Sequence, residues 1–139
     1  MYAKKYIILL YAILNMATIA HADPLSPEKA FQFIGKVENN KIIIYGTVQP
    51  NYKLYKESLK ITNNTSQVQL GGLIKPQAKK QFNKTLNKFQ EEYEGDFLLE
   101  IPIIGSKTNK GKIDFDIEAQ GCTEGLCYSP FSTHIKLLK

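Results

Sequence analysis

The chain has 139 residues, a formal net charge of +5 and two cysteines, and all 18 of its basic residues are lysine. This length favours a single domain. Arginine is the usual bidentate reader of phosphates and guanine edges, so its absence argues against a dedicated nucleic-acid-binding protein.

The first 22 residues have the pattern of a cleaved signal peptide. Lys4 and Lys5 precede an apolar run at residues 6–19, and residues 20–22, Ala-His-Ala, match an A-x-A cleavage site. The run is shorter than the roughly 20 residues of a membrane-spanning helix, and a buried N-terminal helix is the other interpretation. Removing 22 of the 139 residues would leave 117 and lower the net charge from +5 to +3. We therefore expect residues 1–22 to be a signal peptide and residues 23–139 to be one exported domain.

Seven segments of the remaining chain are predicted to be β-strands. The clearest is residues 113–119, in which apolar and acidic residues alternate as in a strand with one buried and one solvated face. Turn-forming Asn, Gly and Pro residues separate the segments. Short strands at this spacing predict an all-β, immunoglobulin-like antiparallel β-sandwich. In chain order the predicted strands are residues 30–36, 41–49, 59–62, 68–70, 97–103, 113–119 and 131–138.

Residues 75–94 break this pattern, because they are rich in Lys, Gln, Asn and Glu. Phe82, Leu86, Phe89 and Tyr93 recur every three or four residues, which is the spacing of an amphipathic helix. A long polar loop with a few aromatic anchors is the alternative, and long loops in compact domains are often functional. The composition does not decide between helix and loop.

The two cysteines, Cys122 and Cys127, lie between the last two predicted strands. Antiparallel pairing of those strands would place both thiols on one hairpin loop. A structural disulfide there would close a ring of only six residues, worth about 2 kcal/mol by loop entropy. A metal site is disfavoured, because zinc needs four ligands and His134, the one remaining histidine, falls on a predicted surface position. A redox-active dithiol is the third interpretation, and the spacing leaves it open beside the structural disulfide.

Three motifs resemble the N-terminal periplasmic domain of the DsbD thiol:disulfide interchange family. Residues 120–130, QGCTEGLCYSP, are similar to the family's active-site hairpin, which reads Q-G-C, a short stretch, then C-Y-P-P. Residues 25–33, LSPEKAFQF, are similar to its opening strand, and residues 51–56, NYKLYK, to its G-Y-Y-L-Y-R motif. The three motifs occur in the family's order and span nearly the whole expected domain.

The resemblance implies an immunoglobulin-like fold and a periplasmic electron relay. Such a domain, a component of a protein-disulfide reductase system, would accept electrons from a membrane-bound thiol reductase through a thioredoxin-like domain. It would then pass them to oxidised periplasmic proteins of the thioredoxin fold. No cofactor, metal or nucleic acid is implied, and we expect a monomer. The alternative is a non-catalytic immunoglobulin-like binding module that carries a permanent disulfide.

The resemblance also implies roles for individual residues. Cys127 matches the cysteine that attacks the partner's disulfide, and Cys122 matches the cysteine that resolves the mixed disulfide. Tyr55 matches a tyrosine beside the pair, and either Phe82 or Phe89 would shield the sulfurs, with Phe82 favoured. Two features depart from the family pattern: Lys53 stands where a tyrosine is usual, and four residues separate the cysteines where many members have five.

Overall fold

The computed structural model describes residues 22–84, 86–107 and 110–139. Apart from Ala22, the expected signal peptide lies outside these residues. Every strand pairing in the described part of the chain is antiparallel. In chain order the elements are α2 (Pro27–Ala30), β1 (Phe31–Glu38), β2 (Lys41–Val48), β3 (Tyr52–Tyr55), the 3-10 helix η1 (Lys56–Ser58), β4 (Lys60–Asn63), β5 (Val68–Leu70), β6 (Lys79–Asn83), β7 (Lys88–Tyr93), β8 (Gly95–Ser106), β9 (Lys112–Ala119), β10 (Gly121–Thr123), β11 (Leu126–Cys127) and β12 (Phe131–Leu138).

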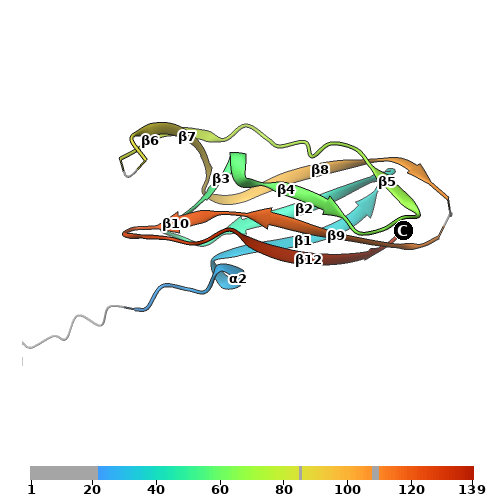
Figure 1. The fold of residues 1–139 in the computed structure, drawn as a ribbon, viewed down its shortest axis with the longest axis horizontal. Coiled ribbons are helices and arrows are strands. Elements are labelled where there is room, and N and C mark those ends of the chain that lie inside the picture. The colour runs from blue at the N-terminus through green and yellow to red at the C-terminus, as the bar shows by residue number, and fades with distance from the viewer. Residues whose placement is uncertain (1–21, 85, 108–109) are drawn as a thin grey trace, which may run out of the picture.

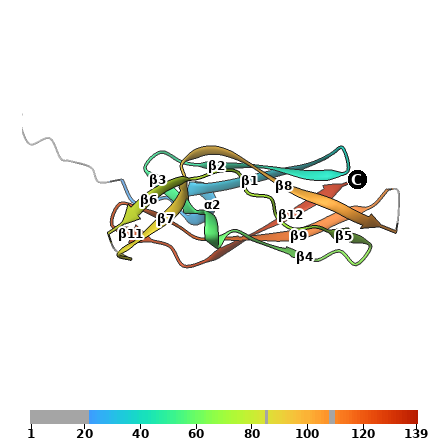
Figure 2. The same cartoon turned by 90° about the horizontal axis from the view of Figure 1, so that it is seen from above.

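Two sheets pack face to face to form the sandwich (Figure 1 and Figure 2). One has the strand order β1-β2-β8-β5 and the other has the order β12-β9-β4. A third sheet, ordered β11-β10-β3-β7-β6, lies at the end of the sandwich opposite the C-terminus. No helix among the described residues is long and apolar enough to cross a membrane.

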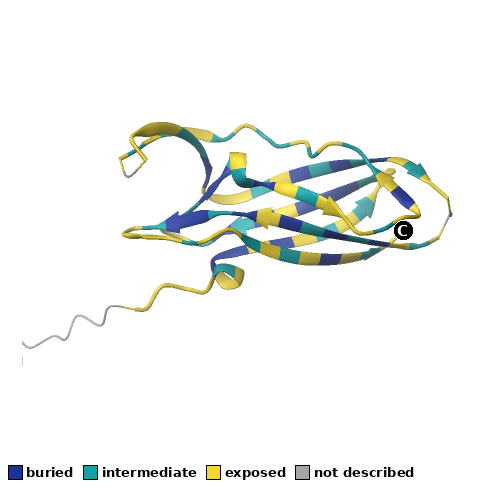
Figure 3. Ribbon diagram, in the orientation of Figure 1, coloured by how far each residue is buried: buried dark blue, intermediate teal, exposed yellow. Residues whose placement is uncertain are grey.

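The core lies between the two facing sheets and follows the alternation in the sequence. In β9 the apolar residues point inward while Asp114, Asp116 and Glu118 point outward, and Figure 3 shows this banding along the strands. Burial of aliphatic and aromatic side chains is the main term that stabilises such a sandwich. The fully buried residues at its centre are Ile42, Ile44, Leu99, Ile101, Ile113, Phe115 and Ile117.

The third sheet is built by strands that run on from the sandwich. Strand β3 follows β2 after a turn at Asn51, β7 leads into β8 at Gly95, and β10 follows β9 directly. Both residues have positive φ angles, 70° at Asn51 and 69° at Gly95, which Asn and Gly adopt with little strain. The framework of the sandwich therefore fixes the position of the third sheet, which carries both cysteines.

The prediction of an all-β, immunoglobulin-like antiparallel sandwich is confirmed, and each predicted strand corresponds to an observed one. Strand β5 has the predicted bounds, and β8 is longer than residues 97–103 at both ends. The predicted antiparallel pairing around the cysteines is also confirmed, because β9 pairs with β12. The motif at residues 25–33 includes one turn of helix, α2, before it enters β1.

The predictions for residues 75–94 were wrong, because the described residues of this segment contain two strands in place of a short helix or one long loop. Residues 79–83 and 88–93 form the hairpin β6–β7, in which Phe82 pairs with Phe89 across the strands. The three-to-four spacing does not mark a buried stripe, since Phe82, Leu86 and Phe89 are all exposed and only Tyr93 is buried. The hairpin is short and largely solvated, so its sequence lacks the alternation that revealed the other strands.

Candidate functional site

The cysteines form a disulfide on the short hairpin β10–β11. Cys122 lies directly opposite Cys127 in the pairing of these two strands, and their Cα atoms are 4.1 Å apart. The turn between the strands includes Gly125, whose φ of 77° suits a residue without a Cβ atom. Cys122 is only 7% exposed, whereas Cys127 is exposed. An attacking sulfur from solvent therefore reaches Cys127 more easily than Cys122.

Strand β3 pairs with strand β10 of this hairpin. Its residue Lys53 pairs with Cys122, and Leu54 pairs with Gly121. A Cβ atom at Gly121 would lie 2.4 Å from the ring of Phe31 and 2.5 Å from the carbonyl oxygen of Lys53. Glycine is therefore required for β10 to approach both β3 and the buried ring of Phe31.

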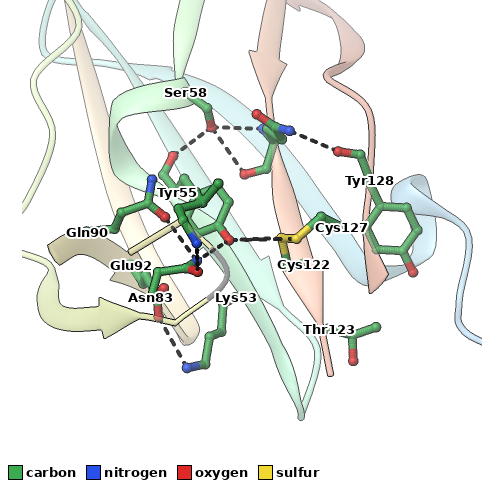
Figure 4. The surroundings of a disulfide bond; sticks show 12 residues. Lys53, Tyr55, Ser58, Asn83, Gln90, Glu92, Cys122, Thr123, Cys127 and Tyr128 are labelled. Atoms are coloured by element: carbon green, nitrogen blue, oxygen red, sulfur yellow. Dashed lines mark hydrogen bonds and ion pairs between the residues drawn. A yellow bond between two sulfur atoms is a disulfide. The ribbon is translucent and has the colours of Figure 1, made fainter. Parts of the chain in front are cut away.

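Tyr55, at the end of β3, contacts both sulfurs. Its hydroxyl oxygen lies 2.9 Å from Cys122 Sγ and 3.9 Å from Cys127 Sγ (Figure 4). Asn83 Nδ2 donates a hydrogen bond of 2.9 Å to the same hydroxyl. Burial raises the pKa of Tyr55, against a smaller lowering by the Asn83 hydrogen bond, so the phenol keeps its proton at neutral pH.

Ser58 connects Tyr55 to the strand that carries Cys122. Its Oγ lies 2.7 Å from the Tyr55 carbonyl oxygen and accepts a hydrogen bond of 2.8 Å from the backbone N–H of Gln120. The backbone N–H of Tyr55 donates to the Gln120 carbonyl at 3.0 Å. These bonds hold the backbone of Tyr55 against the residues that precede Cys122, so the phenol has a fixed position beside the sulfur.

A buried carboxylate lies on the neighbouring strand β7. Glu92 is 3% exposed, and its Oε2 is 3.3 Å from Lys53 Nζ. Lys53 also lies 3.9 Å from Glu94 and donates a hydrogen bond of 3.5 Å to Gln81. A buried carboxylate is costly unless a cation accompanies it. Lys53, which stands where the resembled family usually has a tyrosine, therefore serves here as the counter-ion of Glu92.

An open cavity of about 880 Å³ lies beside the disulfide. Its wall is formed by the cysteine hairpin, by β3 and by the β6–β7 hairpin, and it includes Phe82 and Asn83. Phe89 is not among the lining residues; its ring packs edge-on against Phe82 with centroids 5.2 Å apart. The cavity is large enough to receive a loop or side chains of a partner beside the exposed Cys127.

The structure brings together most of the predicted site residues, with Cys122, Cys127, Tyr55 and Phe82 around one cavity. Sequence reasoning missed Asn83, Ser58 and Glu92, which belong to no motif. Asn83 lies 28 residues from Tyr55 along the chain, and Ser58 lies 62 residues from Gln120. Only the folded chain places these residues at the site.

His134 lies on the outer surface of the β12-β9-β4 sheet, as predicted. Its ring nitrogens are 2.9 Å from Asp114 and 2.6 Å from Asp116. Hydrogen bonds from Asn64 and then from His134 lower the pKa of Asp116. Within the described residues, no group of three or more His, Cys, Asp or Glu side chains is placed to hold a metal ion.

Comparisons with known proteins identify the family. The family model described as "Thiol:disulfide interchange protein DsbD, N-terminal" matches residues 21–139. A thiol:disulfide interchange protein DsbD from Ralstonia nicotianae is 25% identical over 134 residues, which cover 94% of this chain and 22% of that relative. The chain thus spans about a fifth of that relative's length.

Two solved structures from Neisseria meningitidis share the fold. The reduced N-terminal domain of DsbD superposes with a TM-score of 0.70 at 20% identity, over 81% of this chain and 87% of that one. The DsbD N-terminal domain in complex with the PilB N-terminal domain gives a TM-score of 0.67 at 21% identity, over 83% and 88%. The match of the family model over residues 21–139 shows that this protein belongs to the family of DsbD N-terminal domains.

Proposed function

We propose that the chain transfers electrons by thiol–disulfide exchange through Cys122 and Cys127. The single observation that carries this proposal is the arrangement of the disulfide, in which the exposed Cys127 is joined to a buried Cys122 beside a phenol. Accessible disulfides on short loops are the ones that exchange with partner thiols, whereas structural disulfides resist reduction. Membership of a family named for thiol:disulfide interchange supports the same function.

In the proposed direction the reduced domain donates two electrons. The Cys127 thiolate attacks one sulfur of the partner's disulfide, so that a bond forms between the two proteins while the partner's second sulfur leaves as a thiolate. Cys122 then loses its proton and attacks Cys127 Sγ, which closes the intramolecular disulfide and releases the partner's remaining sulfur as a thiolate. The partner is reduced and this domain is oxidised. The exposure of Cys127 and the burial of Cys122 support this order of attack.

The partners in this proposal are oxidised periplasmic proteins of the thioredoxin fold, and the electrons come from a membrane-bound thiol reductase. The Neisseria DsbD domain forms a complex with the PilB N-terminal domain, which supports a protein partner for the present chain. The cavity beside Cys127 offers a place for that partner's active-site loop. Residues 1–22 would direct residues 23–139 to the periplasm.

Phe82 is the proposed shield of the sulfurs. It lines the cavity together with both cysteines, whereas Phe89, whose ring contacts Phe82, is not a lining residue. A partner that displaces the Phe82 side chain would then gain fuller access to the disulfide.

A trapping experiment tests the exchange function. In the variant C122A the resolving sulfur is absent, so a partner with an oxidised disulfide should accumulate as a covalent adduct through Cys127. The adduct should be visible on a non-reducing gel after mixing with a purified, oxidised thioredoxin-fold protein, and dithiothreitol should release it. The matched control is C127A, which retains only the buried sulfur and should give much less adduct. No adduct with C122A, or equal adducts with the two variants, would refute the proposed roles.

The reduction potential separates this function from a permanent structural disulfide. A potential above about −300 mV is expected for an exchanging bond, and a lower one for a structural bond. The measurement requires equilibration of the wild-type domain with redox buffers and quantification of free thiols.

A further inference from the structure

We propose that Asn83 is a positioning residue for the redox step: it orients the Tyr55 hydroxyl so that its proton points at Cys122 Sγ and stabilises that sulfur as a thiolate. This inference rests on the proposed exchange function and adds a polar connection from the β6–β7 hairpin to the cysteines. The connection runs from Asn83 to Tyr55 to Cys122, in contacts of 2.9 Å and 2.9 Å (Figure 4).

The hydrogen bonds of Asn83 fix which of its side-chain atoms faces Tyr55. Its Oδ1 accepts the backbone N–H of Leu86 at 3.0 Å, and a backbone N–H can only donate. Its Nδ2 is therefore the atom that faces Tyr55, and the same nitrogen donates to Gln90 Oε1 at 3.2 Å. An amide nitrogen has two hydrogens, so both are used by these two acceptors.

The direction of the hydrogen bond between Asn83 and Tyr55 determines the direction of the one between Tyr55 and Cys122. A tyrosine hydroxyl has one hydrogen and can also accept hydrogen bonds. Because the Tyr55 oxygen accepts from Asn83, its own hydrogen remains available for the nearest acceptor, which is Cys122 Sγ at 2.9 Å. Tyr55 is 6% exposed, so water competes little for that hydrogen.

The hydrogen bond from the Tyr55 hydroxyl becomes strong when Cys122 is a thiolate. A disulfide sulfur is a weak acceptor, whereas hydrogen bonds to ionised acceptors are roughly twice as strong as neutral ones. Cys122 becomes a thiolate when a donor's thiolate attacks Cys127 Sγ: a bond forms between the donor and Cys127, the bond between Cys122 and Cys127 breaks, and its electron pair stays on Cys122. In the reverse step the same thiolate attacks Cys127 and expels the partner. Tyr55 thus acts where charge develops on the buried sulfur.

The test measures the pKa of the Cys122 thiol when it is the only cysteine. In a C127A background, the rate of reaction with iodoacetamide is recorded from pH 6 to pH 11. We expect Tyr55→Phe to raise the Cys122 pKa by about one unit, a tenfold smaller thiolate fraction at a pH below the pKa. Asn83→Ala should also raise the Cys122 pKa. Asn83→Asp should raise it further, because the Asp carboxylate accepts the hydroxyl proton of Tyr55 and still accepts the backbone N–H of Leu86.

Two controls separate the connection from general effects. Asn87→Asp places the same charge on the exposed turn of the same hairpin and should leave the Cys122 pKa nearly unchanged. Asn83→Ala is also made in the Tyr55→Phe background, where it should cause no further shift, since the hydroxyl that it orients is gone. Thermal unfolding of each variant establishes that the domain is folded.

The outcomes are distinct from those of the trapping experiment. An unchanged Cys122 pKa in Tyr55→Phe, or an equal shift by Asn83→Ala with and without the tyrosine hydroxyl, would overturn the inference even if the covalent adduct forms. A shifted pKa that depends on both residues would support the hydrogen-bond connection even if no adduct forms, and the exchange function would then fail alone.

Discussion

The substitution Gly121→Ala tests whether the close approach at the cysteine hairpin supports the site. Gly121 begins β10 and pairs with Leu54 of β3, one residue before Cys122. An added Cβ atom would lie 2.4 Å and 2.7 Å from two ring atoms of Phe31, and 2.5 Å from the Lys53 carbonyl oxygen.

The contacts of the added atom determine how much stability Gly121→Ala should lose. Ordinary van der Waals contact begins at 3.4 Å, so the new atom must move about 1 Å away from the Lys53 carbonyl. Phe31 cannot yield easily, because it is 1% exposed and its ring stacks on Phe131 with centroids 5.4 Å apart. Overpacking of this kind costs about 1–3 kcal/mol in the free energy of unfolding. Since β10 itself must shift, we also expect the contact between Tyr55 and Cys122 to lengthen.

The assay is urea unfolding of oxidised wild-type and variant domains, followed by the pH dependence of Cys122 alkylation in the C127A background. Gly121→Ala should lower the free energy of unfolding by the stated amount and raise the Cys122 pKa. The matched control is Gly72→Ala, because nothing lies within 4 Å of the added atom there and Gly72 is exposed; its stability should be unchanged or slightly higher. Equal stabilities of the two variants would refute the packing argument. A destabilised Gly121→Ala with a normal Cys122 pKa would refute the link to the site.

Three further predictions concern the shield, the buried carboxylate and pH. Phe82→Ala should accelerate reduction of the disulfide by dithiothreitol several-fold while Phe89→Ala leaves the rate unchanged, and equal rates in stopped-flow measurements would contradict the assignment of Phe82. Lys53→Ala should lower the free energy of unfolding by about 1–3 kcal/mol, because it leaves the Glu92 carboxylate buried without its counter-ion. Adding Glu92→Gln to Lys53→Ala should restore part of that loss in chemical denaturation, and no recovery would show that the charge is not the cause. The lowered pKa of Asp116 means that its carboxylate stabilises the fold above the ordinary pKa of 3.8 and that this contribution disappears as the pH falls through the lowered value. The stability difference between wild type and Asp116→Asn should therefore shrink between pH 5 and pH 2, and a pH-independent difference would contradict the assignment.

The sandwich was predictable because its strands have one buried and one solvated face. In β9 the inward positions are apolar and the outward positions are acidic, so the residue types directly report the burial. Strands β6, β10 and β11 lack this alternation of apolar and acidic residues. They are two to five residues long, and the side chains of β6 and β11 are mostly solvated. Their positions therefore depend on strand pairing, of β6 with β7, of β10 with β3 and of β11 with β10.

The site was predictable only in part, for a related reason. The cysteines stand out by composition, and Tyr55 was found through a motif shared with a family. Asn83 gives no such signal, since an asparagine in a polar segment is ordinary. Its hydrogen bond to Tyr55 depends on the β6–β7 hairpin, which was not predicted, and on the orientation of its side-chain amide toward the Tyr55 hydroxyl.

The disulfide lies at one end of the sandwich, at the edge of the hydrophobic core. The core cluster extends from the two facing sheets into the end sheet through Tyr52, Leu54 and Tyr93, but neither Cys122 nor Tyr55 belongs to it, although both are buried. In the proposed exchange, opening and closing of the disulfide would change contacts in the end sheet and leave the packing of Ile42, Leu99 and Phe115 between the facing sheets as it is. A domain that exchanges electrons as proposed would keep the same folded framework from one turnover to the next.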